Sequence, residues 1–177
     1  MSDQIPVCKN FTGYKPCFPD HNCWKDGCKE NIPIGKKILI INFDAMGDVL
    51  MTTAQLPALK RKFPESTIHW ITLNNAAPLL ANNPYIDRVF VYHPESLSII
   101  SQIEYDLVLN VDKSQRSCVL LNSSSAKKKL GFGLNKISPF DQIILCTHLH
   151  SPDCCLLVVC ARKYNDRCLI ILIEQSI

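Results

Sequence analysis

The residues of this sequence that could carry out chemistry start at the pair Gly47-Asp48, which follows the apolar run Lys37–Asn42. A glycine at this point lets a ligand approach the backbone closely or lets the chain adopt a positive φ. The free N–H groups at the start of a helix bind anionic groups such as a diphosphate, and a carboxylate in the same crevice could take a proton from a hydroxyl. Two interpretations of Asp48 follow: it caps the helix and offsets its dipole, or it is a catalytic base.

Four further polar residues are expected near this carboxylate. Thr52 and Thr53 lie one helical turn after Asp48 and could donate hydrogen bonds to a diphosphate or to an acceptor phosphate. Asp112 and Lys113 follow a second apolar run, at the kind of strand end where ligands bind in open α/β sheets. The alternatives are that the threonines are ordinary helix residues and that Asp112 and Lys113 form a solvated loop pair.

A second group of residues with chemical potential lies near the N-terminus. Four of the ten cysteines gather there: Cys8, Cys17, Cys23 and Cys28. They are separated by eight, five and four residues, with prolines and glycines between them, so the segment is loop-like and cannot build a core of its own. Four thiolates could hold a structural zinc ion in tetrahedral geometry or an iron–sulfur cluster. Because no Cys-x-x-Cys pair is present, disulfides and unligated thiols stay open as alternatives.

The elements that must position these residues alternate between two patterns in residues 37–136. Continuous apolar or β-branched runs predict strands, and they lie at residues 37–42, 67–73, 88–92, 106–111 and 128–132. Apolar residues at helical spacing predict helices, at residues 48–63 with an interruption at Pro57, and at 76–81, 96–103 and 114–121. This alternation predicts an α/β fold: a Rossmann-like, doubly wound parallel sheet with right-handed crossovers.

Composition narrows the class of protein. The chain has 177 residues, of which 47% are hydrophobic; this suits one domain with a real core, with or without appendages, and excludes a disordered chain. A formal net charge of +3 gives no argument for binding nucleic acid. Charges interrupt every apolar run before it reaches the length of a membrane span. The N-terminus has no basic stretch followed by an apolar core, so we expect a cytoplasmic protein with reduced cysteines.

Five segments, in order, resemble glycosyltransferase family 9, the ADP-heptose:lipopolysaccharide heptosyltransferases and their relatives. The first joins the apolar strand to Met46-Gly47-Asp48-Val49-Leu50 and Leu56-Pro57-Ala58-Leu59-Lys60. The others are Ile68-His69-Trp70-Ile71-Thr72, the pair Leu79-Leu80 followed by Asn83-Pro84-Tyr85-Ile86-Asp87, the run from Tyr105 to Asp112, and Lys129-Leu130-Gly131-Phe132-Gly133. Each segment alone is weak evidence, but their order makes the resemblance specific over residues 37 to about 135.

The resemblance implies a GT-B enzyme, in which two Rossmann-like domains face each other across a cleft. The N-terminal domain of such an enzyme mostly holds the acceptor, and the C-terminal domain mostly holds the nucleotide sugar. Catalysis inverts the anomeric centre and needs no metal. The family's candidate general base is the aspartate of its Gly-Asp-Val motif, a role that carries over to Asp48. The substrate-binding residues expected beside it are Gly47, Thr52, Thr53, Asp112 and Lys113.

The implied reaction transfers a sugar from a nucleotide-diphosphate sugar, of the ADP-heptose kind, to a lipopolysaccharide-core or related glycan or glycolipid acceptor. Such an enzyme would work in the cytoplasm, with at most peripheral contact with the inner face of the membrane. The alternative is a non-catalytic α/β module that binds a sugar or a partner protein. An unrelated nucleotide-binding protein is disfavoured because the sequence has neither Gly-x-Gly-x-x-Gly nor a Walker loop.

Composition divides the chain into a cysteine-rich leader at 1–36, the acceptor domain at 37–136 and an atypical tail at 137–177. The tail holds five cysteines and resembles no donor-binding motif, and about forty residues cannot form a second Rossmann domain. We expect a truncated or frame-disturbed end rather than a short extension that adds strands to the sheet edge. Without a donor domain, the isolated chain is expected to have little or no transferase activity.

Overall fold

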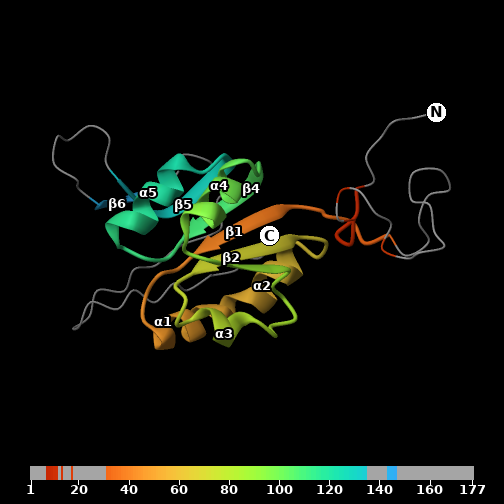
Figure 1. Ribbon diagram of the computed structural model, residues 1–177, viewed down its shortest axis with the longest axis horizontal. Coiled ribbons are helices and arrows are strands. Elements are labelled where there is room, and N and C mark those ends of the chain that lie inside the picture. The colour runs from red at the N-terminus through yellow and green to blue at the C-terminus, as the bar shows by residue number, and fades with distance from the viewer. Residues whose placement is uncertain (1–6, 12, 14–16, 18–30, 135–142, 147–177) are drawn as a thin grey trace, which may run out of the picture.

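The computed structural model describes residues 7–11, 13, 17, 31–134 and 143–146, and this part of the chain contains one six-stranded sheet. The strands are β1 (Lys37–Ile41), β2 (Thr67–Thr72), β3 (Arg88–Val91), β4 (Tyr105–Asn110), β5 (Ala126–Leu134) and β6 (Ile143–Cys146). Their spatial order is β3-β2-β1-β4-β5-β6 (Figure 1). Strands β1 to β5 are parallel, and β6 runs antiparallel to β5. The predicted parallel sheet is confirmed, and each predicted strand boundary lies within two residues of the observed one.

Helices cover both faces of this sheet (Figure 1). They are α1 (Met46–Thr52), the 3₁₀ turn η1 (Thr53–Gln55), α2 (Leu56–Lys62), α3 (Ala77–Leu80), α4 (Pro94–Ser101) and α5 (Gln115–Ser123). Helices α1, α2 and α3 pack on one face, and α4 and α5 pack on the other. The sheet is therefore doubly wound, and the predicted Rossmann-like fold class is confirmed.

Strand β1 shows how the sequence builds a core on each face. Successive side chains of a strand point to opposite faces, so Ile38 and Ile40 join one cluster while Leu39 and Ile41 join the other. Large buried members of the first cluster are Leu56, Leu59, Trp70 and Leu80, and those of the second are Phe90, Ile100, Tyr105 and Leu121. Because β1 lies inside the sheet and is covered on both sides, its buried residues 38–41 form an uninterrupted apolar run.

The long helix predicted at residues 48–63 is three shorter pieces, α1, η1 and α2. The break falls just before Pro57, which occupies the first turn of α2. A proline is tolerated at that position because the first backbone N–H groups of a helix have no partner within it. The predicted break at this proline is therefore confirmed. The predicted cap of α5 is confirmed as well, since the Ser114 hydroxyl accepts a hydrogen bond from the Ser117 N–H.

The order of the strands creates a switch point between β1 and β4. From β1 the chain moves outward to β2 and β3, then returns to β4 on the other side of β1 and continues to β5. The loops that follow β1 and β4 therefore turn away from each other, and such a point is where open α/β sheets bind ligands. The two strands end level, because Ile41 is in register with Asn110.

Strand β6 comes from the segment assigned to the tail. Its residues pair with the end of β5, from Leu134 opposite Ile143 to Gly131 opposite Cys146. These four residues extend the edge of the sheet beyond β5. Residues 135–142 and 147–177 lie outside the described part of the chain, so the preference for a truncated or frame-disturbed end stays a prediction.

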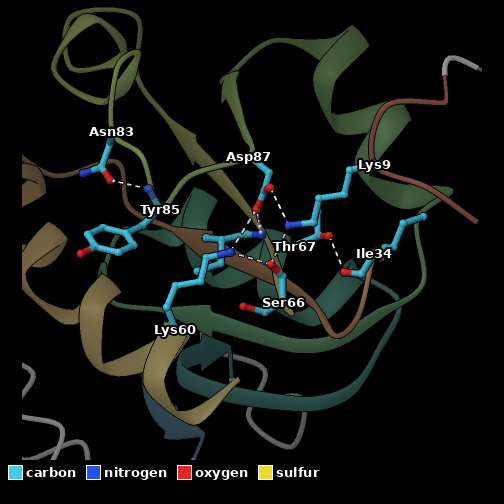
Figure 2. A network of polar contacts seen from close by, with 9 residues as sticks. Lys9, Ile34, Lys60, Ser66, Thr67, Asn83, Tyr85 and Asp87 are labelled. Atoms are coloured by element: carbon cyan, nitrogen blue, oxygen red, sulfur yellow. Dashed lines mark hydrogen bonds and ion pairs between the residues drawn. The ribbon is translucent and has the colours of Figure 1, made fainter. Parts of the chain in front are cut away.

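The leader contacts the sheet at the edge opposite the switch point, where β2 and β3 begin (Figure 2). The Lys9 ammonium donates to the Asp87 carboxylate over 2.7 Å and to the Ser66 carbonyl over 2.9 Å. The Lys60 ammonium donates to the same carbonyl over 2.6 Å and lies 3.5 Å from the same carboxylate. The Ile68 N–H also donates to Asp87, over 2.8 Å. One carboxylate thus joins the leader, α2 and the start of β2.

Candidate functional site

The Gly47-Asp48 pair lies in the first turn of α1, and four residues separate this helix from the end of the central strand β1. The N-cap of α1 is Ala45, and no side chain caps the helix. Asp48 is therefore not the N-cap residue, although its charge still lies in the first turn, where it offsets the dipole. The Asp48 side chain is half-buried and makes no hydrogen bond or ion pair with another described residue. Its carboxylate is thus left available, and its catalytic role stays a prediction.

Gly47 is exposed and has the backbone conformation of the helix, so the expectation of a positive φ is wrong at this position. A Cβ atom added at Gly47 would meet no atom of the chain within 4 Å. Neither φ nor internal packing therefore requires a glycine here, and glycine weakens a helix relative to alanine. Of the two reasons considered for this glycine, close approach of a ligand is the one that remains.

The two threonine hydroxyls are both engaged with the helix. The Thr52 hydroxyl donates to the Asp48 carbonyl over 2.7 Å, and it accepts a hydrogen bond of 3.0 Å from the buried side-chain amide of Asn42. The Thr53 hydroxyl donates to the Leu50 carbonyl over 2.6 Å. Thr52 thus joins the end of β1 to α1, whereas no described contact joins Thr53 to the other candidate residues. Substrate binding by either threonine stays a prediction.

Asp112 is only 5% exposed and fixes the loop after β4 to the loop after β1. Its carboxylate accepts hydrogen bonds from the Phe43 N–H over 3.3 Å and from both the N–H and the hydroxyl of Ser114 over 2.7 Å. Three donors within the chain satisfy a carboxylate that is this deeply buried. The geometry favours a positioning role for Asp112, and the alternative of a solvated loop pair does not apply to it.

Lys113 directly follows Asp112 in the sequence and carries a positive charge. Its ammonium lies 5.8 Å from the centre of the Phe132 ring, at the limit of a cation–π contact. It forms no ion pair with a carboxylate in the described part of the chain. A half-exposed ammonium beside the switch point could attract an anionic group, so its substrate-binding role is still a prediction.

Two asparagines that complete the site were missed in the sequence. Asn42 lies just past the end of β1, and its side-chain oxygen accepts from the Asp44 N–H over 3.0 Å. Asn110 is the last residue of β4; it donates to the Phe132 carbonyl over 2.6 Å and accepts from the Asp112 N–H over 3.1 Å. Both are almost fully buried. An amide that directly ends each of two apolar strands is the pattern that could have identified them.

His69 lies within β2, away from this edge. Burial lowers its pKa to about 4, with the positive charge of Arg88 as the next cause. This pKa makes the imidazole neutral at pH 7, and its Nδ1 atom lies 3.0 Å from the Tyr105 hydroxyl, which holds the ring in place. We assign it a structural role.

The structure describes two of the four leader cysteines. Cys8 is buried and Cys17 is exposed, and both are free thiols. Cys23 and Cys28 lie outside the described residues, so the predicted zinc or iron–sulfur site stays a prediction. Among the described helices, none combines the length and apolar character needed to cross a membrane.

No family model matches the chain, and no curated protein matches it. Solved structures do. The glycosyl transferase of family 9 from Veillonella parvula DSM 2008 is 24% identical, with a TM-score of 0.50, and the match covers 55% of this chain and 32% of that one. The E. coli heptosyltransferase WaaC with ADP is 19% identical, with a TM-score of 0.49, over 54% of this chain and 34% of that one.

A third similar structure is the E. coli ADP-heptose lps heptosyltransferase II, which is 18% identical with a TM-score of 0.47. The match covers 52% of this chain and 29% of that one. This chain thus spans about a third of the length of the structures that it matches. Over that third, it has the α/β fold of a family 9 glycosyltransferase structure.

Proposed function

We propose that this chain is the acceptor-side domain of a glycosyltransferase of the heptosyltransferase type, with Asp48 as the general base. The observation that carries the proposal is the placement of one carboxylate. Asp48 follows the central strand at the switch point of the sheet, is half-buried, and has no partner among the described side chains. Two other carboxylates of the described residues lie near the switch point: Asp112 is buried and already hydrogen-bonded, and Asp44 is exposed.

In the proposed reaction, Asp48 takes the proton of the acceptor hydroxyl while the acceptor oxygen bonds to the anomeric carbon of the donor sugar. The bond from that carbon to the nucleoside diphosphate breaks on the opposite side, so the configuration inverts. General base catalysis of this kind contributes about 10² to 10⁴ in rate. From the resemblance to family 9, we propose that this step proceeds without a metal ion.

The surroundings of Asp48 support a bound acceptor. The exposed Gly47 leaves open space directly before it, so a sugar ring can reach the backbone of α1 without meeting a side chain at that position. The Asn42 to Thr52 hydrogen bond and the Phe43 to Asp112 hydrogen bond fix the two loops around it. A base must be held in place before it can act efficiently, and these contacts hold the helix that carries Asp48.

The donor is proposed by resemblance. Two of the similar structures are an E. coli heptosyltransferase with ADP and one with ADP-2-deoxy-2-fluoro heptose. We propose a nucleotide-diphosphate sugar of this kind as the donor, and a lipopolysaccharide-core or related glycan as the acceptor. Because about two thirds of the matched family 9 structure has no counterpart in the match, we propose that turnover requires a donor domain in addition to the described residues.

Acceptor binding by the chain itself tests the proposal. Lipopolysaccharide-core oligosaccharides are titrated into the 15N-labelled chain, and amide shifts are followed by NMR. We expect saturable shifts at Gly47, Asp48 and Lys113. Gly47→Ala should weaken binding about tenfold because a methyl group would occupy the space of the ligand, whereas Asp44→Asn, an exposed change in the same loop, should leave binding unchanged. Shifts confined to the amino edge of the sheet, or none at millimolar ligand, would refute the proposal.

A further inference from the structure

A cavity of about 400 Å³ lies between α4 and α5, on the face of the sheet opposite α1. Its size is in the range of small-molecule sites. Its floor is aliphatic and is formed by Leu97, Ile100, Val119 and Leu120. Tyr92 and Arg116 line the end where α5 begins, and Ser101, Ser123 and Ser124 line the end where the two helices stop. The cavity therefore has an apolar body with one cation at one end.

The polar groups at the serine end are already satisfied by the helices. Each serine hydroxyl donates to a backbone carbonyl three residues earlier: Ser101 over 2.7 Å, Ser123 over 3.2 Å and Ser124 over 2.8 Å. These hydroxyls therefore place no demand on a ligand. An alkyl chain could lie against them without leaving a buried donor unpaired.

Arg116 is the charged residue of the lining. Its guanidinium carbon lies 5.9 Å from the centre of the Phe43 ring and 6.0 Å from that of Tyr92, at the outer limit of cation–π contact. Arg116 is exposed and forms no ion pair with a carboxylate in the described part of the chain. A planar guanidinium with free donors is suited to a carboxylate, which it can bind through two parallel hydrogen bonds.

We propose that this cavity binds a single-chain amphipathic carboxylate, with its head on Arg116 and its alkyl chain along the floor between α4 and α5. From Arg116 to Ser123, α5 advances about 10 Å, the length of a medium alkyl chain. The apolar floor supplies affinity, since each buried methylene contributes about fourfold. The site is distinct from the one proposed around Asp48, because α1 packs on the other face of the sheet.

The proposal is tested with octanoate and the full chain, by methyl NMR. We expect saturable shifts at the Val119 methyl groups and none at those of Leu50, a similarly exposed residue on α1 (47% and 55% exposed, respectively). Hexanoate should bind about fifteenfold more weakly because it lacks two methylenes. The neutral 1-octanol should bind about fivefold more weakly than octanoate. Arg116→Gln should abolish the preference for octanoate over 1-octanol, whereas Arg61→Gln on α2 should preserve it.

A second pair of variants tests the cavity itself. Val119→Glu should abolish octanoate binding by filling the floor with a like charge, and the matched Leu50→Glu should not change it. Equal, non-saturating shifts at Val119 and Leu50 would overturn the proposal, since they would show that octanoate adheres to any exposed apolar side chain. Equal affinity for octanoate and 1-octanol in the unmodified chain would also overturn it, because the ligand would then be a neutral apolar molecule.

Discussion

Replacement of Gly131 by alanine should destabilise the chain strongly, because the structure leaves no room for a side chain there. Gly131 has a φ of +106°, a conformation that L residues rarely adopt, and it lies opposite Asn110 in the pairing of β4 with β5. An added Cβ would lie 1.8 Å from the Asn110 carbonyl oxygen and 2.7 Å from its carbon. Backbone atoms cannot rotate away, so the two strands must separate locally.

The magnitude follows from two contributions. A non-glycine residue in this region of φ costs about 1–3 kcal/mol, and displaced strand pairing costs about 1 kcal/mol for each disrupted hydrogen bond. With two such hydrogen bonds disrupted, we expect Gly131→Ala to lower the free energy of unfolding by about 3–5 kcal/mol. That is a large part of the 5–15 kcal/mol that stabilises a typical domain.

Gly47→Ala is the matched control for this experiment. Its Cβ would meet no atom of the chain within 4 Å and its backbone is helical, so alanine should stabilise the chain by about 0.5–1 kcal/mol. Both free energies are measured by urea unfolding, followed by far-UV circular dichroism, at unchanged m-value. A Gly131→Ala chain within 1 kcal/mol of the unmodified chain, or a Gly47→Ala chain as unstable as Gly131→Ala, would refute the reasoning.

Three further predictions concern the amino edge, the histidine and the leader. Asp87→Asn should cost about 1–2 kcal/mol in urea unfolding, because two lysine ammonium groups lose their carboxylate, whereas the exposed Glu65→Gln should cost nothing measurable. Burial lowers the pKa of His69 to about 4, so the unfolded chain protonates first as the pH falls. The free energy of unfolding should therefore drop by up to about 3 kcal/mol between pH 6.5 and 4; persistence of the whole drop in His69→Asn would contradict this. Elemental analysis of the gently purified protein should find about one zinc ion per chain, or else iron together with the visible absorption of an iron–sulfur cluster. Less than about a tenth of an equivalent, or full occupancy retained in Cys17→Ser, would contradict a four-cysteine site.

The fold could be predicted from the sequence because the pattern of apolar and polar residues along the chain agrees with the packing of the strands and helices. A strand that is covered on both faces is apolar along its buried length, and residues 38–41 of β1 show that pattern directly. Pro57 marked the break between α1 and α2, and Ser114 marked the start of α5. In each case a local physical rule and the tertiary structure favour the same conformation.

The site could be predicted only in part, because its hydrogen bonds join residues far apart in the sequence. Substrate binding by Asp112 stays a prediction, and its buried carboxylate accepts a hydrogen bond from Phe43, which lies 69 residues earlier. No local pattern reveals such a partner. Asn42 and Asn110 were missed for the same reason: an amide at a strand end is ordinary until the register of β1 and β4 places both ends side by side.

The contact made by the leader could not be predicted from local pattern either. Its cysteines suggested a metal site, but the residue that is observed to join it to the sheet is a lysine. Lys9 reaches Asp87, 78 residues further along the chain, at the amino edge of the sheet (Figure 2). Asp87 was noted only as part of a family-like segment, and nothing local to it indicates a partner in the leader.

The central claim is that Asp48 is the base that deprotonates the acceptor, and the most direct test is transfer by a hybrid enzyme. Residues 31–134 of this chain replace the matching third of the Veillonella parvula glycosyltransferase, and sugar transfer is measured for the hybrid with Asp48, with Asp48→Asn and with Asp44→Asn. The account predicts that Asp48→Asn lowers kcat by about 10² to 10⁴ with the acceptor KM nearly unchanged, while Asp44→Asn remains fully active. A hybrid that transfers sugar equally well with asparagine at position 48 would contradict the account.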